Sequence, residues 1–139
     1  MLRSLFAVPV AALVLFAVPA PAGAADEENP VVKLIKSKVK DEKKPFAILV
    51  TFKVKPGNEK KFEEAFAPAL AATRKEPGCV AYYLNRDTEQ ASNYVMYEQF
   101  KGIPGLEAHL KEKHTQTLLA TVIPLCEGDP QIKVLTVPE

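Results

Sequence analysis

The side chains best able to move a proton near neutral pH are two histidines, His109 and His114. Histidine titrates near pH 6.5, so it can act as a general base or acid where other side chains cannot. Both lie in a segment that is predicted to be helical, and an isolated helical histidine is more often structural than catalytic. A structural and a catalytic role therefore stay open for each ring.

The spacing of the two histidines argues against a shared site. Five residues at about 100° each place the rings about 140° apart on an ideal helix. His114 then lies near the centre of the apolar stripe of the helix and His109 towards its edge. Because helical two-histidine metal sites use residues four apart, the sequence predicts no metal site here.

A carboxyl group lies among apolar side chains on a predicted strand. Alternate residues of a strand point the same way, so one face is expected to carry Tyr94, Met96, Glu98 and Phe100. Glu98 can orient an imidazole or bind a hydroxyl group, and Tyr82 on the preceding strand can donate to a substrate oxygen. Two alternatives stay open: Glu98 pairs with Arg86 across the hairpin, or Tyr82 is a core residue.

The elements that must hold these residues follow the order strand, helix, strand, strand, helix, strand. Strands are predicted over residues 46–54, 79–86, 94–100 and 131–137, and helices over residues 60–75 and 104–122. Proline and glycine turns separate them. This order predicts an α+β fold, the ferredoxin-like βαββαβ arrangement, with a four-stranded antiparallel sheet and two helices on one face. The other face needs cover, which predicts a homodimer.

The first residues are typical of an export signal. Arg3 precedes an apolar run from Leu5 to Val18, and Ala22-Gly23-Ala24 is a cleavage signature. We expect a signal peptide over residues 1–24, an exported protein (periplasmic or secreted), and no stable membrane insertion after cleavage; an uncleaved anchor is the alternative. Residues 25–44 are expected to form a charged flexible linker, with a short amphipathic helix as the alternative, before a domain over residues 45–139.

Charge and cysteine content limit the possible partners. Eighteen Lys and Arg against 17 Asp and Glu give a net charge of +1, which argues against nucleic acid as a partner. Cys79 and Cys126 fall at opposite ends of the predicted sheet, too far apart for a disulfide within one chain. Two free thiols are expected, and a disulfide between subunits stays open.

Residues 46–126 resemble the antibiotic biosynthesis monooxygenase domain, whose members include quinol monooxygenases. The matching residues are Val54-Lys55-Pro56-Gly57, Glu76-Pro77-Gly78-Cys79-Val80-Ala81-Tyr82, Tyr97-Glu98-Gln99-Phe100, Leu106-Glu107-Ala108-His109-Leu110 and His114. The resemblance implies a dimeric α+β barrel with a pocket for an aromatic, quinol-like molecule between sheet and helices. Active members oxygenate such molecules with O₂ and without metal or flavin, whereas others degrade haem or have no demonstrated chemistry.

The resemblance also implies roles for the candidate residues. His109 is expected to be the catalytic base, assisted by Glu98 and Tyr82, with substrate contacts from Phe100, His114, Tyr94 and Met96 and with no cofactor or metal. Haem degradation depends on a tryptophan and a first-strand asparagine, and this chain has no Trp and no Asn over residues 46–54. Two functions remain: a cofactor-independent monooxygenase of a quinol or small phenol, or a non-catalytic dimeric module that binds a small molecule.

Overall fold

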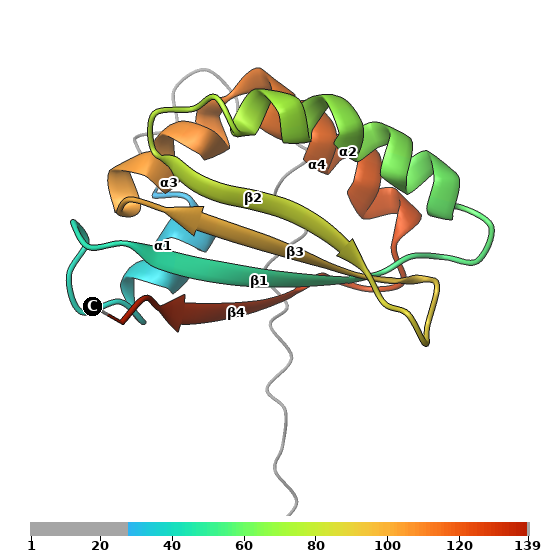
Figure 1. Cartoon of the computed structure of the whole chain (residues 1–139), viewed down its shortest axis with the longest axis horizontal. Helices are drawn as coiled ribbons and strands as arrows, with labels where there is room; N and C mark the ends of the chain where they lie inside the picture. Colours follow the sequence, from blue (N-terminus) through green and yellow to red (C-terminus); the bar gives the residue numbers. More distant parts are fainter. Residues whose placement is uncertain (1–27, 139) are drawn as a thin grey trace, which may run out of the picture.

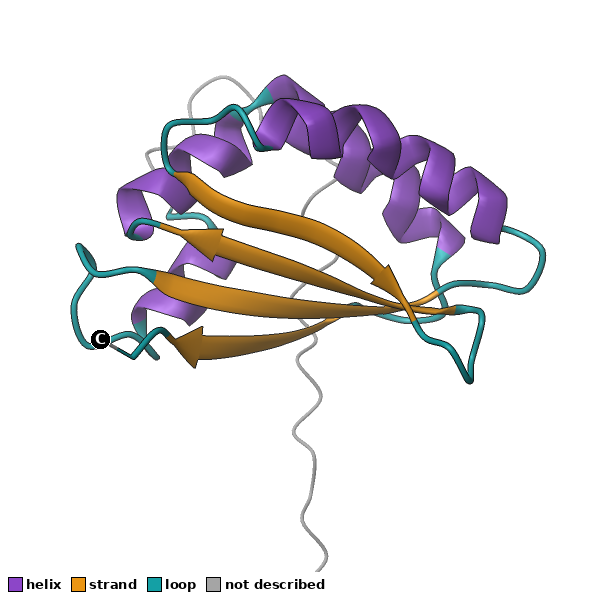
Figure 2. Cartoon of the chain, viewed as in Figure 1, coloured by secondary structure: helices purple, strands orange, loops and turns teal. Residues whose placement is uncertain are grey.

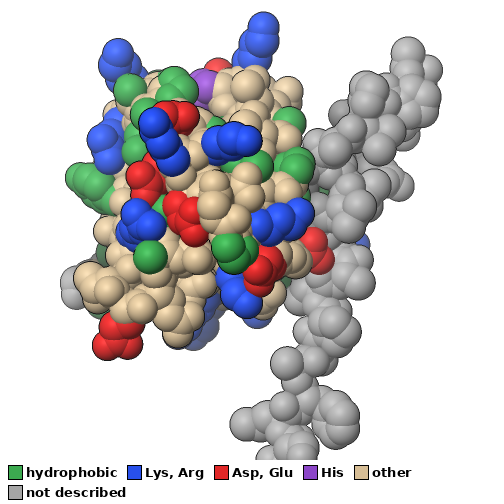
Figure 3. Space-filling view, turned by 90° about the vertical axis from the view of Figure 1, so that its right-hand side faces the viewer, with side chains coloured by type: hydrophobic (Ala, Val, Ile, Leu, Met, Phe, Trp, Pro, Cys, Tyr) green, Lys and Arg blue, Asp and Glu red, His purple; other side chains and the backbone are tan. Residues whose placement is uncertain are grey.

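The computed structural model describes residues 28–138. The predicted signal sequence lies outside these residues, so its cleavage and the export of the protein stay predictions. None of the helices within residues 28–138 is long and apolar enough to cross a membrane. Acidic and basic side chains are interspersed on the face seen in Figure 3.

Four strands form one antiparallel sheet in the order β2-β3-β1-β4. Their bounds are Phe46–Lys53 for β1, Cys79–Arg86 for β2, Asn93–Phe100 for β3 and Gln131–Thr136 for β4. Each strand end lies within one residue of its predicted position. The predicted α+β, ferredoxin-like fold is therefore confirmed.

Three helices cover one face of this sheet, as Figures 1 and 2 show: α2 (Glu59–Thr73), α3 (Ile103–Lys111) and α4 (Lys113–Val122). Helix α2 continues through Pro68 as a single helix. Its Phe62 and Phe66 side chains pack against Phe52 of β1, with ring centroids 5.3 and 5.9 Å away. These rings form the centre of one of two apolar clusters.

The single helix predicted over residues 104–122 is wrong, because the chain breaks at Glu112. This residue is extended, with φ −65° and ψ 138°, and α4 starts in a new direction after it. His109 is consequently buried, at 2% exposure, while 25% of the His114 side chain is exposed. This is the reverse of the burial that an unbroken helix predicts.

The charged linker predicted over residues 25–44 is also wrong for its central part, which forms helix α1 (Pro30–Lys36). The Asn29 side chain caps this helix by accepting a hydrogen bond from the backbone N–H of Val31 at 2.9 Å. Val32 and Ile35 are buried in the second apolar cluster, with residues of β1, β3 and α3. The short amphipathic helix that the apolar spacing allowed is therefore present, and its charged residues remain on the outer side.

The face of the sheet away from the helices carries an apolar row that no helix within residues 28–138 covers. Tyr83, Tyr97 and Leu49 lie side by side on neighbouring strands, and Tyr83 is 54% exposed. An irregularity between Cys79 and Ala81 interrupts the alternation of β2, so Val80 is 49% exposed. A β-bulge of this kind changes the face to which a side chain points.

The two cysteines are free within the chain, as predicted. Cys79 pairs with Phe100 at one end of the sheet. Cys126 pairs with Val54 just beyond the other end. A disulfide between two subunits stays an open prediction.

Candidate functional site

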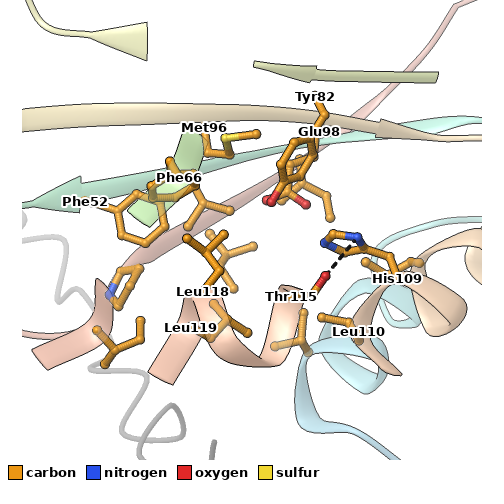
Figure 4. A pocket seen from close by; sticks show the side chains of 17 residues that line it. Phe52, Phe66, Tyr82, Met96, Glu98, His109, Leu110, Thr115, Leu118 and Leu119 are labelled. Atoms are coloured by element: carbon orange, nitrogen blue, oxygen red, sulfur yellow. Dashed lines mark hydrogen bonds between the residues drawn. The ribbon is translucent and has the colours of Figure 1, made fainter. Parts of the chain in front are cut away.

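A cavity of about 80 Å³ lies between the sheet and the helices. Residues of helices α1 to α4 and of strands β1 to β4 line it. Most of the lining side chains are apolar (Figure 4). The polar or ionisable groups among the lining residues are Tyr82, Glu98, His109 and Thr115. Apolar pockets with a few convergent polar groups are typical of small-molecule sites.

The sheet contributes Tyr82, Met96 and Glu98, which all point towards the helices. Tyr82 lies directly opposite Glu98 in the pairing of β2 with β3. Arg86 does not pair with Glu98, because its guanidinium lies 3.3 Å from Glu63 Oε1. Within residues 28–138, no hydrogen bond or ion pair joins the Glu98 carboxyl to another group.

The ionisation of the Glu98 and Tyr82 side chains is suppressed. Burial, with a smaller contribution from the charge of Glu76, raises the pKa of Glu98 to about 8. Burial likewise raises the pKa of the Tyr82 hydroxyl above its ordinary value, as do the nearby carboxylates. Both groups are therefore protonated at neutral pH and can donate a hydrogen bond to an oxygen in the cavity.

The helices contribute His109, which faces Glu98 across the cavity (Figure 4). Its Nδ1 lies 3.0 and 3.1 Å from the two carboxylate oxygens of Glu76, and 3.3 Å from Thr115 Oγ1. Because a carboxylate only accepts hydrogen bonds, Nδ1 carries the proton. The neutral ring then has its free lone pair on Nε2, which has no hydrogen-bond partner along the described chain.

Burial keeps this ring in the neutral form. It lowers the pKa of His109, an effect that Glu76 partly offsets. A neutral imidazole held by a carboxylate on one nitrogen can accept a proton on the other. His109 therefore has the geometry of an oriented general base.

Glu76 also accepts a hydrogen bond from the second histidine. Its Oε1 lies 2.7 Å from His114 Nε2, and its side chain is 11% exposed. The prediction that the two rings point to different places is wrong, because the break at Glu112 turns both towards one carboxylate. The spacing of the two histidines therefore does not exclude a shared metal site.

Comparison with known proteins assigns the chain to a family. The model of the antibiotic biosynthesis monooxygenase family matches residues 45–121. The chain belongs to this family. The match confirms the resemblance seen in the sequence, whereas the comparison with curated proteins finds no match.

Several solved structures share the fold. A putative antibiotic biosynthesis monooxygenase from Caulobacter crescentus is 28% identical, with a TM-score of 0.64 over 70% of this chain and 93% of that chain. One from Nitrosomonas europaea is 19% identical, with a TM-score of 0.66 over 71% and 95%. A conserved protein of unknown function and possible oxidoreductase from Bacteroides thetaiotaomicron is 22% identical, with a TM-score of 0.62 over 67% and 97%.

In this member of the antibiotic biosynthesis monooxygenase family, four of the seven candidate residues line the cavity: Tyr82, Met96, Glu98 and His109. The expectation that the other three do so is corrected. Tyr94 lies under α2, where its hydroxyl donates to Glu63 Oε1 at 2.6 Å. Phe100 is fully buried behind His109, with ring centroids 5.2 Å apart. His114 lines a separate surface groove between α2 and α4.

Sequence reasoning missed the roles of Glu76 and Thr115 in this site. Glu76 was visible in the Glu-Pro-Gly-Cys turn that carries the family resemblance, yet the turn gave no reason to place it beside a histidine. Thr115 is 2% exposed, and its position beside His109 depends on the unpredicted break at Glu112. The family motif was therefore the only available signal for Glu76.

The raised pKa of Glu98 predicts a pH-dependent stability. The folded chain binds this proton more tightly than the unfolded chain, whose carboxyl titrates near 4.5. The free energy of unfolding should therefore fall as pH rises from about 4.5 to about 8 and change no further above that range. At about 1.4 kcal/mol per pKa unit, the loss is at most about 5 kcal/mol.

Denaturant unfolding of wild type and Glu98→Gln at pH 5 and pH 9 measures this effect. The variant cannot ionise at this position, so it should lose less stability than wild type at the higher pH. Glu64→Gln, at an exposed site on α2, should behave as wild type. Equal losses in wild type and Glu98→Gln would show that Glu98 is not protonated in the fold.

Proposed function

We propose that the protein is a cofactor-independent monooxygenase that oxygenates a quinol or other small phenol in the cavity beside His109. The reaction balances without an external reductant. A hydroquinone, C₆H₆O₂, reacts with O₂ to give a hydroxyquinone, C₆H₄O₃, and water. One oxygen atom enters the ring, the other leaves as water, and the substrate supplies all four electrons.

The observation that carries this proposal is the orientation of His109. Glu76 holds its Nδ1 proton at 3.0 Å, which leaves Nε2 free to accept a proton from a phenol in the cavity. The resulting phenolate transfers an electron to O₂ far more readily than the neutral phenol does. His109 is the catalytic base in this scheme, and Glu76 is a positioning residue.

The opposite wall supplies hydrogen-bond donors for the substrate oxygens. Glu98, protonated up to about pH 8, and Tyr82 face the same space as His109. Donors placed where negative charge develops stabilise an anionic intermediate most strongly when water is excluded. The apolar walls around them provide that exclusion.

The cavity limits the size of the substrate. Benzene occupies an apolar cavity of about 150 Å³ in a protein core, so the observed 80 Å³ admits one ring only after side chains move. Half-buried apolar residues of the lining, including Leu110, Leu119 and Ile123, are those with room to move. A compound with a single ring is therefore the expected substrate.

The alternative is a non-catalytic module that binds a small apolar molecule, which the predominance of apolar lining supports. Oxygen uptake with a panel of single-ring quinols, measured beside ligand binding, separates the two functions. Protein-dependent uptake supports the monooxygenase. Binding of a quinol in the cavity without oxygen uptake supports the module.

We also infer that the face of the sheet away from the helices forms a homodimer, which would complete the dimeric α+β barrel that the family resemblance implies. Leu49→Lys places a charge in the apolar row and should yield monomers, whereas Ala71→Lys, on the exposed side of α2, should leave the dimer intact. Light scattering measures the mass of each variant. A stable, folded monomer of the wild type at micromolar concentration would contradict the inference.

A further inference from the structure

Three side chains from separate elements bring metal-binding atoms together. His109 Nδ1, His114 Nε2 and a carboxylate oxygen of Glu76 all lie within 4.8 Å of one another. Glu76 precedes β2, His109 lies on α3 and His114 on α4. The three groups therefore meet only because the chain is folded and broken at Glu112.

These donors match the preferences of a zinc-class ion. Two imidazole nitrogens and one carboxylate oxygen, with a fourth position open to water, are a recurring zinc ligand set. A tetrahedral zinc ion keeps neighbouring donors roughly 3.3 Å apart, close to the 3.0 and 2.7 Å that separate the Glu76 oxygen from the two nitrogens. The ion would take the place of the two hydrogens that now bridge these atoms.

Carboxyl groups also lie near the histidine rings, on the side away from the proposed metal ion. A metal-bound histidine usually donates its second N–H to a carboxylate, which fixes the ring. Glu112 Oε2 lies 4.0 Å from His114 Nδ1, and Glu98 faces His109 across the cavity. Glu112 therefore lies near the His114 nitrogen that would carry the proton, within ion-pair distance but beyond direct hydrogen-bond distance.

An ion can reach these donors without passing through the cavity. The His114 side chain is 25% exposed and lines the groove between α2 and α4. A site that is open on one side and buried on the other allows binding by a modest rotation of His114. Both the donor atoms and the access from solvent are therefore compatible with a bound metal ion.

We propose that Glu76, His109 and His114 form a binding site for a divalent transition-metal ion of the zinc class. Binding moves the proton of the neutral His109 ring from Nδ1 to Nε2 and that of the neutral His114 ring from Nε2 to Nδ1, with no net loss of protons. The His109 ring then donates a hydrogen bond into the cavity and no longer accepts a proton. Zinc would consequently inhibit the oxygenation proposed above; this consequence rests on the proposed function, whereas binding itself does not.

Titration calorimetry of the full chain, freed of metals by a chelator and dialysed, tests the site with ZnCl₂. One ion per chain should bind to wild type, His114→Ala should lose nearly all of this binding, and Glu112→Gln should weaken it by about 10-fold, as loss of an outer carboxylate does. Mg²⁺, which prefers oxygen ligands, should not bind there. His114 is partly exposed, so its variant is expected to fold.

Two control variants make the result decisive. Cys79→Ser and Glu63→Gln remove other groups that attract zinc, and neither should change the stoichiometry or affinity. Absence of zinc binding to wild type would overturn the proposal, as would unchanged binding to His114→Ala or loss of binding in Cys79→Ser. Calorimetry does not depend on turnover. Absence of zinc binding would therefore disprove the metal site without disproving the oxygenase activity, and absence of oxygenase activity would not disprove the metal site.

Discussion

His109→Ala is expected to lower kcat/KM for a quinol by about 10²–10⁴-fold, the usual contribution of a positioned general base. Without the imidazole, none of the helix residues that line the cavity carries a basic group. The change is measured as protein-dependent oxygen uptake over a range of quinol concentrations. Wild type and variant are compared at a pH below 8, where Glu98 remains protonated.

Stability must be separated from catalysis in this variant. If His109 lay at the edge of the apolar stripe, as the sequence predicts, its replacement by alanine would leave the melting temperature almost unchanged. In the structure, however, His109 is 2% exposed, and its ring centroid lies 5.2 and 5.4 Å from those of Phe100 and Tyr82. Alanine therefore leaves a cavity and should lower the melting temperature as well. His109→Gln retains volume and an N–H donor for Glu76 but has no basic atom; if it kept full activity, His109 would not be the base.

Gly78→Ala is expected to destabilise the fold at the contact between two glycines. A Cβ atom at residue 78 would lie 2.5 Å from Gly105 Cα, so the turn before β2 and the first turn of α3 cannot keep their contact. Overpacking of this kind typically costs about 1–3 kcal/mol. The melting temperature of a domain this size should fall by roughly 5–15 °C, and the separation of α3 from the turn should also draw His109 away from Glu76.

Gly105→Ala is the matched control for this contact. Its Cβ would lie 3.1 Å from Gly78 Cα, a milder clash, and alanine gains about 1 kcal/mol over glycine inside a helix. Its net effect should therefore be much smaller than that of Gly78→Ala. Thermal unfolding followed by circular dichroism compares them, and equal melting temperatures for Gly78→Ala and wild type would contradict the close approach.

The strands and α2 could be predicted because their signals are local. Alternating β-branched and aromatic residues, with proline and glycine turns between them, placed every strand end within one residue. The helix α1 was underestimated because charge density in residues 25–44 outweighed its few apolar residues. Tertiary contacts decide that this segment forms a helix, among them the packing of Val32 and Ile35 onto β1 and α3 and the ion pair of Lys36 with Glu107.

The candidate site depends on features with no local signal. Neither proline nor glycine occurs in the Lys111-Glu112-Lys113 segment where α3 and α4 separate, so periodicity extended one helix through the break. That error misplaced both histidines and hid their shared contact with Glu76. Tyr94 and Phe100 share the inward strand face with Met96 and Glu98, but which part of that face adjoins the cavity depends on where the helices lie.

The central claim, oxygenation by the chain's own residues, is tested most directly with isotopically labelled oxygen. Chelator-treated protein is incubated with a single-ring hydroquinone under ¹⁸O₂, and the product is analysed by mass spectrometry beside a reaction without protein. We expect a hydroxyquinone with one ¹⁸O atom, formed by wild type and about 10²–10⁴-fold more slowly by His109→Gln. A quinol that binds in the cavity and is recovered unchanged, or is oxidised without label, would contradict the central claim.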